Sequence, residues 1–573
     1  MKYGPAYQIY PVETLRELLF KATDRYSDRK ALMGKRDGKY QGFSYGGLRR
    51  RIEAVGTVLL SRGLKKGDRV GLVGENRPEW AVSYLGIVSA GLVAVPIDKD
   101  LNEREIKHIL SYAEVRVLIA SADYLRLLVD DRASIPSLEV IISMEDDCQG
   151  ADLDFPTVLE TGTSEVEAGN HQFSDLTVKP DDLAVLIFTS GTTGASKGVM
   201  LTHQNVASNV MGTSHHVAIS MHDIVLSVLP LHHTYEATAG FLTALYQGAT
   251  ICYAESLRRI ADNLRETRAS VLLGVPALFE AMFRRIEAGI AEKGKGKFAL
   301  AKGLASLSEK VLRVNVRRKI FRELHAKFGG SLRLMISGGA AINPSVSKGY
   351  RELGINFIQG YGMTENSPII SVNRVDAFKD DSVGLPLPNA EVKIVDDEIV
   401  VRGSSVMLGY YKNPAATEEA LRDGWLYTGD LGYFDRDGFL HVNGRRKSVI
   451  VTPNGKNVYP EEIESILNQS PFVLESLVWG GPESDPSLTE VQAIIVPDTE
   501  HFDKVFGAAS YDEEKILNVI SQEVKTVNRE LSGFKRIKKF VIRGEEFEKT
   551  TTRKIKRYLY TTKTTPLKRR LFS

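Results

Sequence analysis

The sequence is poor in cysteine and carries almost no net charge. Its two cysteines, Cys148 and Cys252, are too few for a disulfide framework, so a reducing, cytoplasmic environment is expected. The formal net charge is +2 over 573 residues. This balance argues against a chain that binds nucleic acid along its whole surface, and against a disordered acidic chain.

The sequence also lacks a long uninterrupted hydrophobic run. The most apolar stretch, Val82–Ile97, is broken by Gly86 and Gly91 and ends at Pro96. It therefore predicts a buried helix that leads into a strand, and not a membrane span. The segment Met1–Phe20 has no basic stretch followed by an apolar core, so no secretory signal peptide is expected.

The composition is that of a globular protein, with 43% hydrophobic and 25% charged residues. The chain is too long for one ordinary hydrophobic core, so two or more domains are expected. Short β-rich runs alternate with helical patterns, which predicts an α/β fold of parallel sheets with helices on their faces. Asn76 is expected to cap a helix that has Pro78 in its first turn. A second helix is expected at Leu101–Glu114. The expected strands are Val70–Gly74, Val93–Ile97, Val115–Ala120, Leu183–Thr189, Ile224–Leu229, Val271–Val275 and Leu332–Ile336.

The pattern changes after Asp381, where hairpin signals become dense and indicate an added β-rich portion. Asp437-Gly438 predicts a two-residue turn between two apolar runs. A polar junction near Lys447 predicts a boundary between a large domain, 1–446, and a small mobile α+β domain, 447–573. The elements expected in the small domain are a helix at Pro460–Asn468, strands at Leu477–Gly480 and Val491–Val496, a helix at Glu513–Leu531 and a strand at Lys538–Ile542.

Two segments are strongly basic. Arg284–Lys327 holds thirteen Lys/Arg against four Glu, and Lys549–Ser573 holds nine Lys/Arg and no acidic residue. One interpretation is a solvated helical face and a loose tail. The other is attraction to anionic lipid headgroups or to a phosphate-rich ligand, which would place the protein at the inner face of a membrane as a peripheral protein.

A loop rich in glycine and hydroxyl groups, 189–198, follows an apolar strand. Glycines allow backbone N–H groups to approach a polyanion, the hydroxyls add donors, and Lys197 supplies positive charge. It is not a Walker loop, because Ser196 precedes the lysine and Gly198 follows it. A flexible linker is the competing interpretation, but a linker seldom leaves a buried strand directly. The loop therefore predicts a phosphate site.

This loop resembles the phosphate loop of the adenylate-forming (AMP-binding) superfamily, which includes acyl-CoA synthetases, luciferases and the adenylation domains of peptide synthetases. Five further segments resemble the other motifs of that superfamily in the expected order. They are Leu229–Glu236, Ser337–Ala340, Gln359–Glu365, Tyr427–Asp430 with Gly444–Arg445, and Phe547–Ile555. The resemblance spans nearly the whole chain.

The resemblance implies a role for each matching residue. Lys554, His233 and Lys197 would be catalytic, with His233 orienting the acid's carboxylate. Glu365 would bind Mg²⁺, for which a carboxylate is a suitable hard ligand. The implied ATP contacts are Thr189, Ser190, Gly191, Thr192, Thr193, Gly194, Gly338, Gly339, Ala340, Gly360, Tyr361, Gly362, Thr364, Asp430 and Arg445.

The sequence departs from the family pattern at three positions. Arg553 stands where the family usually has glycine before the catalytic lysine, which concerns the local turn. Ser196 replaces a common proline before Lys197, which changes the stiffness of the loop. Ser448 follows Lys447, the implied hinge, where aspartate is frequent.

The resemblance also implies a reaction with ATP, Mg²⁺ and coenzyme A. The acid would become an acyl-adenylate and then a thioester, with the small domain turning at Lys447 between the two steps. Thr234 follows His233 where amino-acid-activating members have aspartate, and Asp423–Lys447 is similar to the signature of fatty acyl-CoA synthetases. A medium- to long-chain fatty acid is therefore expected. Transfer to acyl-carrier protein is one alternative, and a catalytically silent nucleotide-binding regulatory protein is another.

Overall fold

The computed structural model describes residues 4–5, 8–146, 148–190, 196–293, 302–303, 316–452, 456–481, 489–508, 510–550 and 555–561. The chain forms two compact units. The first comprises Met1–Val392 and Val401–Leu426, and the second comprises Lys393–Val400 and Tyr427–Ser573. The predicted domain division into 1–446 and 447–573, which was placed at the polar junction near Lys447, stays a prediction.

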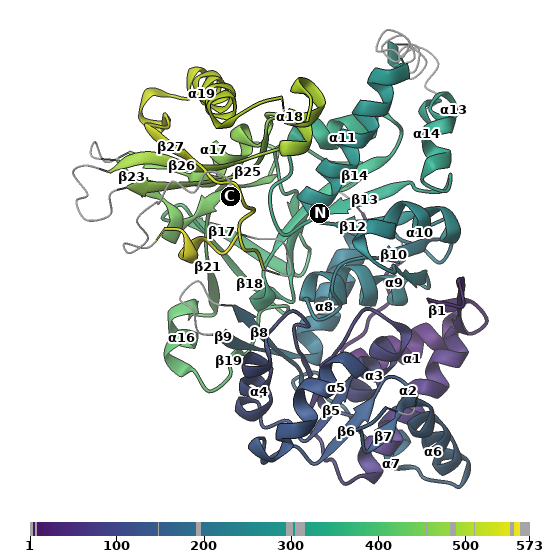
Figure 1. Ribbon diagram of the computed structural model, residues 1–573. Helices are drawn as coiled ribbons and strands as arrows, with labels where there is room; N and C mark the ends of the chain where they lie inside the picture. The colour runs from purple at the N-terminus through teal and green to yellow at the C-terminus, as the bar shows by residue number, and fades with distance from the viewer. Residues whose placement is uncertain are drawn as a thin grey trace. The chain divides into compact units, whose positions relative to one another are not determined.

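An eight-stranded sheet in the first unit carries the strands on either side of the glycine-rich loop. Its order is β19-β9-β8-β4-β3-β5-β6-β7, with parallel pairing from β8 to β7. Helix α3 packs against β3 and β4 (Figure 1). The strands are β3 Arg69–Val73, β4 Val93–Pro96, β5 Val117–Ala120, β6 Val140–Ser143, β7 Leu153–Asp154, β8 Leu183–Ser190, β9 Ser196–Thr202 and β19 Gly409–Tyr410.

A nine-stranded sheet in the same unit has the order β16-β15-β14-β13-β12-β10-β11-β1-β2, and its central strands from β14 to β1 are parallel. Loops beyond the carboxyl ends of such strands are the usual ligand sites of α/β sheets. The strands are β1 Lys30–Arg36, β2 Lys39–Ser44, β10 Ile224–Ser227, β11 Thr250–Tyr253, β12 Val271–Gly274, β13 Leu334–Ser337, β14 Asn356–Gly362, β15 Ile369–Val372 and β16 Leu385–Pro386.

Helices cover these sheets, as the alternating pattern predicts. Helix α4 buries one face with Ile106, Ile109 and Leu110, whereas α3 is buried over nearly its whole length. All the predicted strands of this unit are present with ends shifted by at most a few residues, so the α/β fold is confirmed. The helices are α1 Leu15–Arg25, α2 Tyr45–Ser61, α3 Pro78–Ser89, α4 Glu103–Tyr112, α5 Ala122–Leu128, α6 Phe155–Glu167, α7 Gln172–Asp175, α8 His203–His216, the π-helix η2 Tyr235–Leu242, α9 Thr243–Tyr246, α10 Ile260–Thr267, α11 Pro276–Lys293, α13 Arg317–Ile320, α14 Arg322–Lys327, α15 Pro344–Glu352 and α16 Pro414–Ala420.

The predicted cap of α3 is wrong. The N-cap is Arg77, whose side chain makes no capping hydrogen bond. The amide of Asn76 instead donates to Leu229 O (2.6 Å) and accepts from Leu231 N (3.0 Å). A side chain that is expected to serve its own helix thus holds a loop more than 150 residues away in the sequence.

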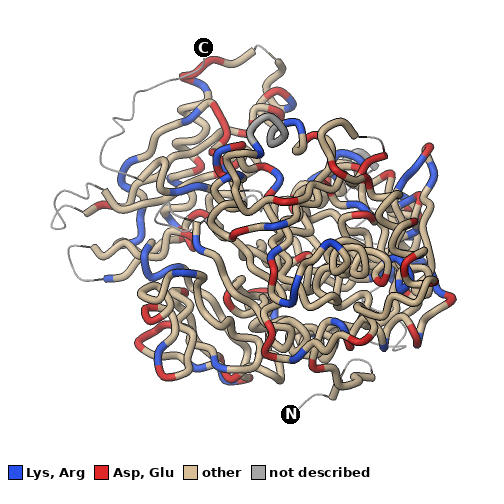
Figure 2. Tube along the Cα trace, turned by 90° about the horizontal axis from the view of Figure 1, so that it is seen from below, with Lys and Arg blue, Asp and Glu red and all other residues tan. Residues whose placement is uncertain are grey.

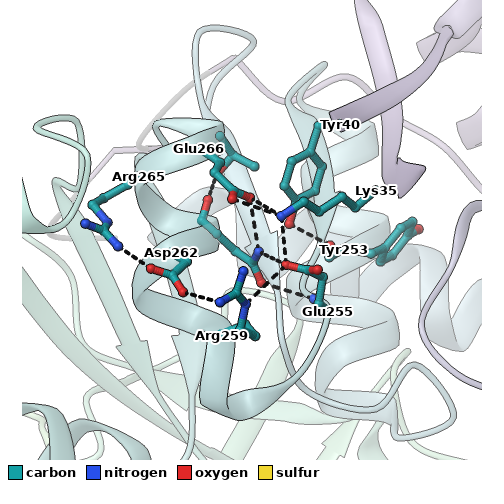
Figure 3. Close-up of polar contacts among 10 residues, drawn as sticks. Lys35, Tyr40, Tyr253, Glu255, Arg259, Asp262, Arg265 and Glu266 are labelled. Carbon is teal, nitrogen blue, oxygen red and sulfur yellow. Dashed lines mark hydrogen bonds and ion pairs between the residues drawn. The ribbon is translucent and has the colours of Figure 1, made fainter. Parts of the chain in front are cut away.

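A polar network joins β1, the end of β11 and α10 (Figure 3). Lys35 Nζ lies 3.0 Å from Glu255 and 2.8 Å from Glu266, and the Asn263 amide donates to Glu255 at 2.7 Å. Lys35 has 10% of its side chain exposed, so its ammonium depends on these partners. The network ties β1 and the end of β11 to α10.

The second unit contains an antiparallel hairpin and a small α+β body. The hairpin strands β21 and β22 belong to a sheet with order β17-β18-β21-β20, in which β22 pairs with β21. The body is a three-stranded sheet, β25-β26-β27, packed against helices around a core that includes Ile463, Val478 and Ile520. The elements of this sheet, in which β20 belongs to the first unit, and of the body are β17 Ala390–Val395, β18 Glu398–Gly403, β20 Leu421–Arg422, β21 Trp425–Phe434, β22 Leu440–Arg445, β23 Ile450–Val451, β24 Asn457–Val458, α17 Pro460–Leu467, β25 Val473–Gly481, β26 Glu490–Pro497, α18 Thr499–Phe506, α19 Glu513–Glu530 and β27 Lys539–Ile542.

The two-residue turn predicted at Asp437-Gly438 is wrong in length. The last paired residues of the hairpin are Phe434 and Leu440, so five residues form the loop. Asp435 Oδ1 accepts hydrogen bonds from the backbone N–H of Asp437 and Phe439, at 2.9 and 3.0 Å. This carboxylate stabilises the longer loop, and Gly438 supplies the positive φ of +86° that it needs.

Basic and acidic residues are interspersed along the trace, in keeping with the small net charge (Figure 2). In the part of the chain that the structure describes, no helix has both the length and the apolar character to cross a membrane. Much of the first basic segment and most of the second lie outside the described residues, so their attraction to membranes stays a prediction.

Candidate active site

The strands on either side of the glycine-rich loop are an antiparallel pair. Thr189 of β8 lies opposite Lys197 of β9, and Ser190 lies opposite Ser196. The Ser196 hydroxyl donates to Thr189 O at 3.1 Å, which closes the base of the loop. The predicted phosphate contacts Gly191, Thr192, Thr193 and Gly194 lie outside the described residues.

Lys197 and the predicted magnesium ligand Glu365 both lie beside one residue, Tyr410, that the sequence patterns do not indicate. Tyr410 Oη donates to Glu365 Oε1 at 2.8 Å, and Lys197 Nζ lies 4.7 Å from the centre of the Tyr410 ring. Tyr410 comes from β19, which pairs with β9 at Val199. The only sequence signal for it is an aromatic residue directly after a glycine, which is too common to single it out.

Glu365 has carboxylate oxygens that could bind a magnesium ion. Glu365 is half-buried in the short helix Thr364–Asn366, and its backbone oxygen accepts from Met407 N at 2.9 Å. The Tyr410 hydrogen bond occupies one lone pair of the carboxylate and leaves other hard oxygen sites. These suit Mg²⁺, which prefers oxygen ligands and keeps several of its own waters.

The two predicted adenine segments end neighbouring parallel strands. Ser337 of β13 pairs with Gln359 of β14, so Gly338, Gly339 and Ala340 lie beside Gly360, Tyr361 and Gly362. A Cβ on Gly338 would come within 2.8 Å of the Tyr235 ring, and Gly339 has a φ of +86°. Glycine is therefore required in this turn for both packing and backbone conformation. Tyr361 is half-buried, which suits a ring that packs on a purine.

The predicted acid motif follows β10 and leads into the π-helix η2. His233 is half-buried, and its backbone N–H donates to Pro230 O at 3.1 Å. The Thr234 and Thr364 hydroxyls lie 3.4 Å apart, so the acid motif and the Glu365 segment meet at this point. Thr364, a predicted ATP contact, therefore lies next to Thr234, the residue after His233.

Two polar residues of this region were not singled out by the sequence. Asp98 lies beyond β4, and its Oδ1 is 3.3 Å from His232 Nε2. Glu236 is the last residue of the acid motif. It is 1% exposed and closely packed, because a Cβ on Gly240 would lie 2.7 Å from its carboxylate. Burial raises the pKa of Glu236 to about 8, and the nearby Ser227 hydroxyl offsets only part of this effect.

The predicted ribose pair lies in the second unit and is brought together by the hairpin. Asp430 and Arg445 occupy paired positions on β21 and β22, and Arg445 Nε donates to Asp430 Oδ1 at 3.0 Å. Asp430 is buried, whereas 47% of the Arg445 side chain is exposed. Gly429, with a φ of +72°, donates its N–H to Glu398 Oε1 at 2.7 Å. The hairpin thus presents one acceptor and one cation side by side.

The structure describes the predicted hinge residue but not the predicted terminal lysine. Lys447 is exposed in a short 3₁₀ turn, Arg446–Ser448. Lys554 lies outside the described residues, which stop at Thr550 and resume at Ile555. Lys549 and Ile555 form an antiparallel bridge, and Lys549 pairs with Glu475 at 2.7 Å. Lys549, which precedes the terminal lysine in the chain, is thus held against β25 by an ion pair.

Comparison with known proteins places this geometry in a family. Residues 19–411 match the family described as AMP-binding enzyme, and residues 447–568 match the AMP-binding enzyme C-terminal domain. The long-chain-fatty-acid–CoA ligase FadD15 of Mycobacterium bovis is 31% identical over 539 residues, which cover 88% of each chain. The peroxisomal long chain acyl-CoA synthetase 7 of Arabidopsis thaliana is 31% identical over 94% of this chain and 81% of its own length.

A solved structure shares the fold. The crystal structure of ATP-bound MatB from Rhodopseudomonas palustris aligns with a TM-score of 0.73 at 26% identity, over 96% of this chain and 98% of that one. The family match, the relatives and the ordered site motifs agree with one another. This chain belongs to the AMP-binding enzyme family.

Proposed function

We propose that the protein is an ATP-dependent, AMP-forming ligase that converts a medium- to long-chain fatty acid to an acyl-adenylate and then to acyl-CoA. The observation that carries this proposal is the arrangement of Lys197, Tyr410 and Glu365, with the acid motif adjoining at Thr364. A cation, a carboxylate and an acid-orienting histidine are the groups that adenylation requires. The similarity to relatives named long-chain-fatty-acid–CoA ligases supports the substrate class.

In the first step, an oxygen of the fatty acid carboxylate attacks the α-phosphorus of ATP, and the bond to pyrophosphate breaks. His233 would hold the carboxylate, and Tyr361 would pack against the purine. Lys197 would neutralise phosphate charge, and Lys554 would bridge the two anions that meet, which lowers the barrier electrostatically. Mg²⁺, held by Glu365, would supply charge neutralisation on the phosphates when bound.

In the second step, the thiol of coenzyme A attacks the acyl carbonyl carbon, the bond to the phosphate oxygen breaks and AMP leaves. We propose that the small domain, 447–573, turns at Lys447 between the steps, which withdraws Lys554. Asp430 and Arg445 would hold the ribose, because an acceptor beside a cation suits a diol next to a phosphate.

Two alternatives make different predictions. A fatty acyl–acyl-carrier-protein synthetase would transfer the acyl group to a carrier protein in place of coenzyme A. A catalytically silent nucleotide-binding protein would release no pyrophosphate, although it would have little reason to keep Lys554 and Glu365 together. We favour the ligase with coenzyme A because the relatives of matching length are named for it.

The decisive experiment measures pyrophosphate release with acetate, octanoate, palmitate, an aryl acid and several amino acids, with coenzyme A or carrier protein as acceptor. Each methylene removed from water contributes about 0.8 kcal/mol, so eight more methylenes than acetate would contribute about 6 kcal/mol before entropy losses. We expect the highest kcat/KM for octanoate or palmitate. A maximum at acetate, the aryl acid or an amino acid would refute the fatty-acid assignment but not adenylation.

We further propose a cytoplasmic protein that attaches peripherally to anionic membranes through its basic segments, since each lysine or arginine near such a surface contributes about 1 kcal/mol. Sedimentation with anionic vesicles at low and high salt tests this attachment. Salt-sensitive binding is expected. Protein that stays in the supernatant at low salt would support the alternative of a solvated basic face.

A further inference from the structure

Three potential metal ligands converge in the first unit from two different sheets. Asp98 follows β4 of the eight-stranded sheet, whereas His232 and His233 follow β10 of the nine-stranded sheet. One ligand atom from each of the three side chains lies within 4.8 Å of the others. The two imidazole rings have centroids 4.6 Å apart. The carboxyl ends of parallel strands thus bring together two imidazoles and a carboxylate.

The three side chains form a partly buried site supported by hydrogen bonds, which distinguishes it from an accidental cluster of surface residues. His232 is 5% exposed, and among the described residues its Nε2 has no hydrogen-bond partner of acceptable geometry although it faces Asp98 Oδ1 at 3.3 Å. A buried imidazole nitrogen without a good partner is costly. Asp98 Oδ1 accepts a hydrogen bond from Asp100 N at 2.9 Å. In the loop that precedes His232, the Asn76 side-chain amide donates to Leu229 O and accepts from Leu231 N. A backbone N–H therefore holds the Asp98 carboxylate, and the Asn76 side chain holds the loop that carries His232.

The donor set and its spacing select the class of cation. Two nitrogens and one carboxylate suit Zn²⁺ and Co²⁺, whereas Mg²⁺ and Ca²⁺ prefer oxygen ligands. Tetrahedral zinc with bonds of about 2.0–2.1 Å separates adjacent donors by about 3.3–3.4 Å. The 3.3 Å between His232 Nε2 and Asp98 Oδ1 matches that separation. Half-buried His233 would complete three ligands by a small side-chain rotation, which leaves the fourth position to water.

We propose that Asp98, His232 and His233 form a binding site for a cation of the Zn²⁺ class, and that the bound cation inhibits acid activation. The inhibition rests on the proposed function, in which His233 orients the fatty acid carboxylate. An imidazole nitrogen that coordinates a metal is no longer available to the acid. Zinc would therefore compete with the fatty acid and not with Mg-ATP, whose predicted ligand is Glu365.

Metal binding is measured first, without turnover. The full-length protein, carrying C148S to remove the half-exposed thiol, is freed of metal by a chelator. It is then titrated with Zn²⁺ against a chromogenic chelator and with Co²⁺ by visible absorption. We expect one equivalent to bind with a tetrahedral Co²⁺ spectrum. D98N and H232Q should each weaken binding at least about tenfold, since loss even of a group that supports a ligand costs 10–100-fold. H222Q, at an exposed histidine outside the cluster, is the matched control.

Inhibition is measured next, as initial rate against fatty acid concentration at fixed Mg-ATP with and without Zn²⁺. The C148S protein should show a zinc-dependent rise in KM for the acid, and D98N should keep its metal-free activity but lose this rise. Equal zinc affinity in the C148S protein and both variants, all folded by circular dichroism, would overturn the site. Unchanged inhibition in variants that no longer bind zinc would overturn the competition. Absence of activity with every acid would refute the proposed function and leave the binding result standing.

Discussion

Tyr410 and Glu365 are joined by a hydrogen bond of 2.8 Å from the phenol to carboxylate oxygen Oε1. Burial and then the Glu365 charge raise the pKa of Tyr410 far above the physiological range, so its hydroxyl remains a donor. Lys197 lies over the same ring. The tyrosine therefore positions the predicted magnesium ligand and contacts the predicted phosphate-binding lysine at once.

Tyr410→Phe should weaken the use of Mg²⁺ while the ring stays in place. A hydrogen bond to a charged group contributes about 1.5–3 kcal/mol, so kcat/KM for Mg-ATP should fall by about tenfold or more, with a higher requirement for Mg²⁺. Steady-state rates over a magnesium titration measure this effect. Tyr411→Phe, next in the chain, is the control. If the Tyr410→Phe enzyme keeps the parent magnesium dependence, the hydrogen bond is not functional.

Glu365→Gln should impair the use of Mg-ATP more strongly than Tyr410→Phe, because a neutral amide is a poorer magnesium ligand than a carboxylate. The double variant should be little worse than Glu365→Gln alone, because the tyrosine acts through the carboxylate. Rates of pyrophosphate release at several magnesium concentrations test both statements. Full additivity of the two effects, or a parent-like Glu365→Gln enzyme, would contradict this assignment.

Lys554→Ala should abolish most adenylation but leave thioester formation from supplied acyl-AMP largely intact. The reason is the proposed role of the lysine in the first step alone, where two anions meet. The two half-reactions are assayed separately, and Lys556→Ala serves as a neighbouring control. Equal losses in both half-reactions, in a protein with normal thermal unfolding, would refute this role.

Glu236→Gln should change the pH dependence of stability. The pKa of this buried carboxyl is about 8 against an ordinary value of 4.5. Between these values the unfolded chain ionises while the folded one stays protonated, so parent stability falls as pH rises, by several kcal/mol in total. The variant should lack this loss and be the more stable protein near pH 8. Denaturant unfolding at pH 5 and pH 8 measures it, and parallel pH profiles would contradict the assignment.

His203→Asn should reduce sensitivity to mild acid. Burial lowers the pKa of His203 to about 4 from 6.5, although Asp182 opposes the shift. As pH falls from 6.5 to 4, only the unfolded chain gains the proton, which costs about 3 kcal/mol of stability. Asparagine keeps an acceptor for the Leu15 N–H that now donates to Nδ1 at 3.3 Å. Thermal unfolding between pH 7 and pH 4 should show a smaller loss in the variant, and an unchanged loss would exclude His203 as its source.

Much of the fold and the identity of the motifs could be predicted from sequence, because both depend on signals within short segments. Apolar runs bounded by helical patterns placed strands such as β5 and β12 to within about two residues. The hairpin before Arg445 was also expected, but not its length, because the Asp435 side chain stabilises a longer loop. Asp430 and Arg445 meet because antiparallel pairing aligns them.

The α/β class, the order of the motifs and the chemical types in the site could be predicted from the sequence alone, since these follow from periodicity and local composition. Which polar groups meet depends on the tertiary structure. Asn76 holds the acid motif instead of capping its own helix, and Tyr410 reaches Glu365 across 45 residues of sequence. Asp98 faces His232 because two sheets end side by side. Such contacts depend on how strands pair and sheets pack, and no local pattern encodes that arrangement.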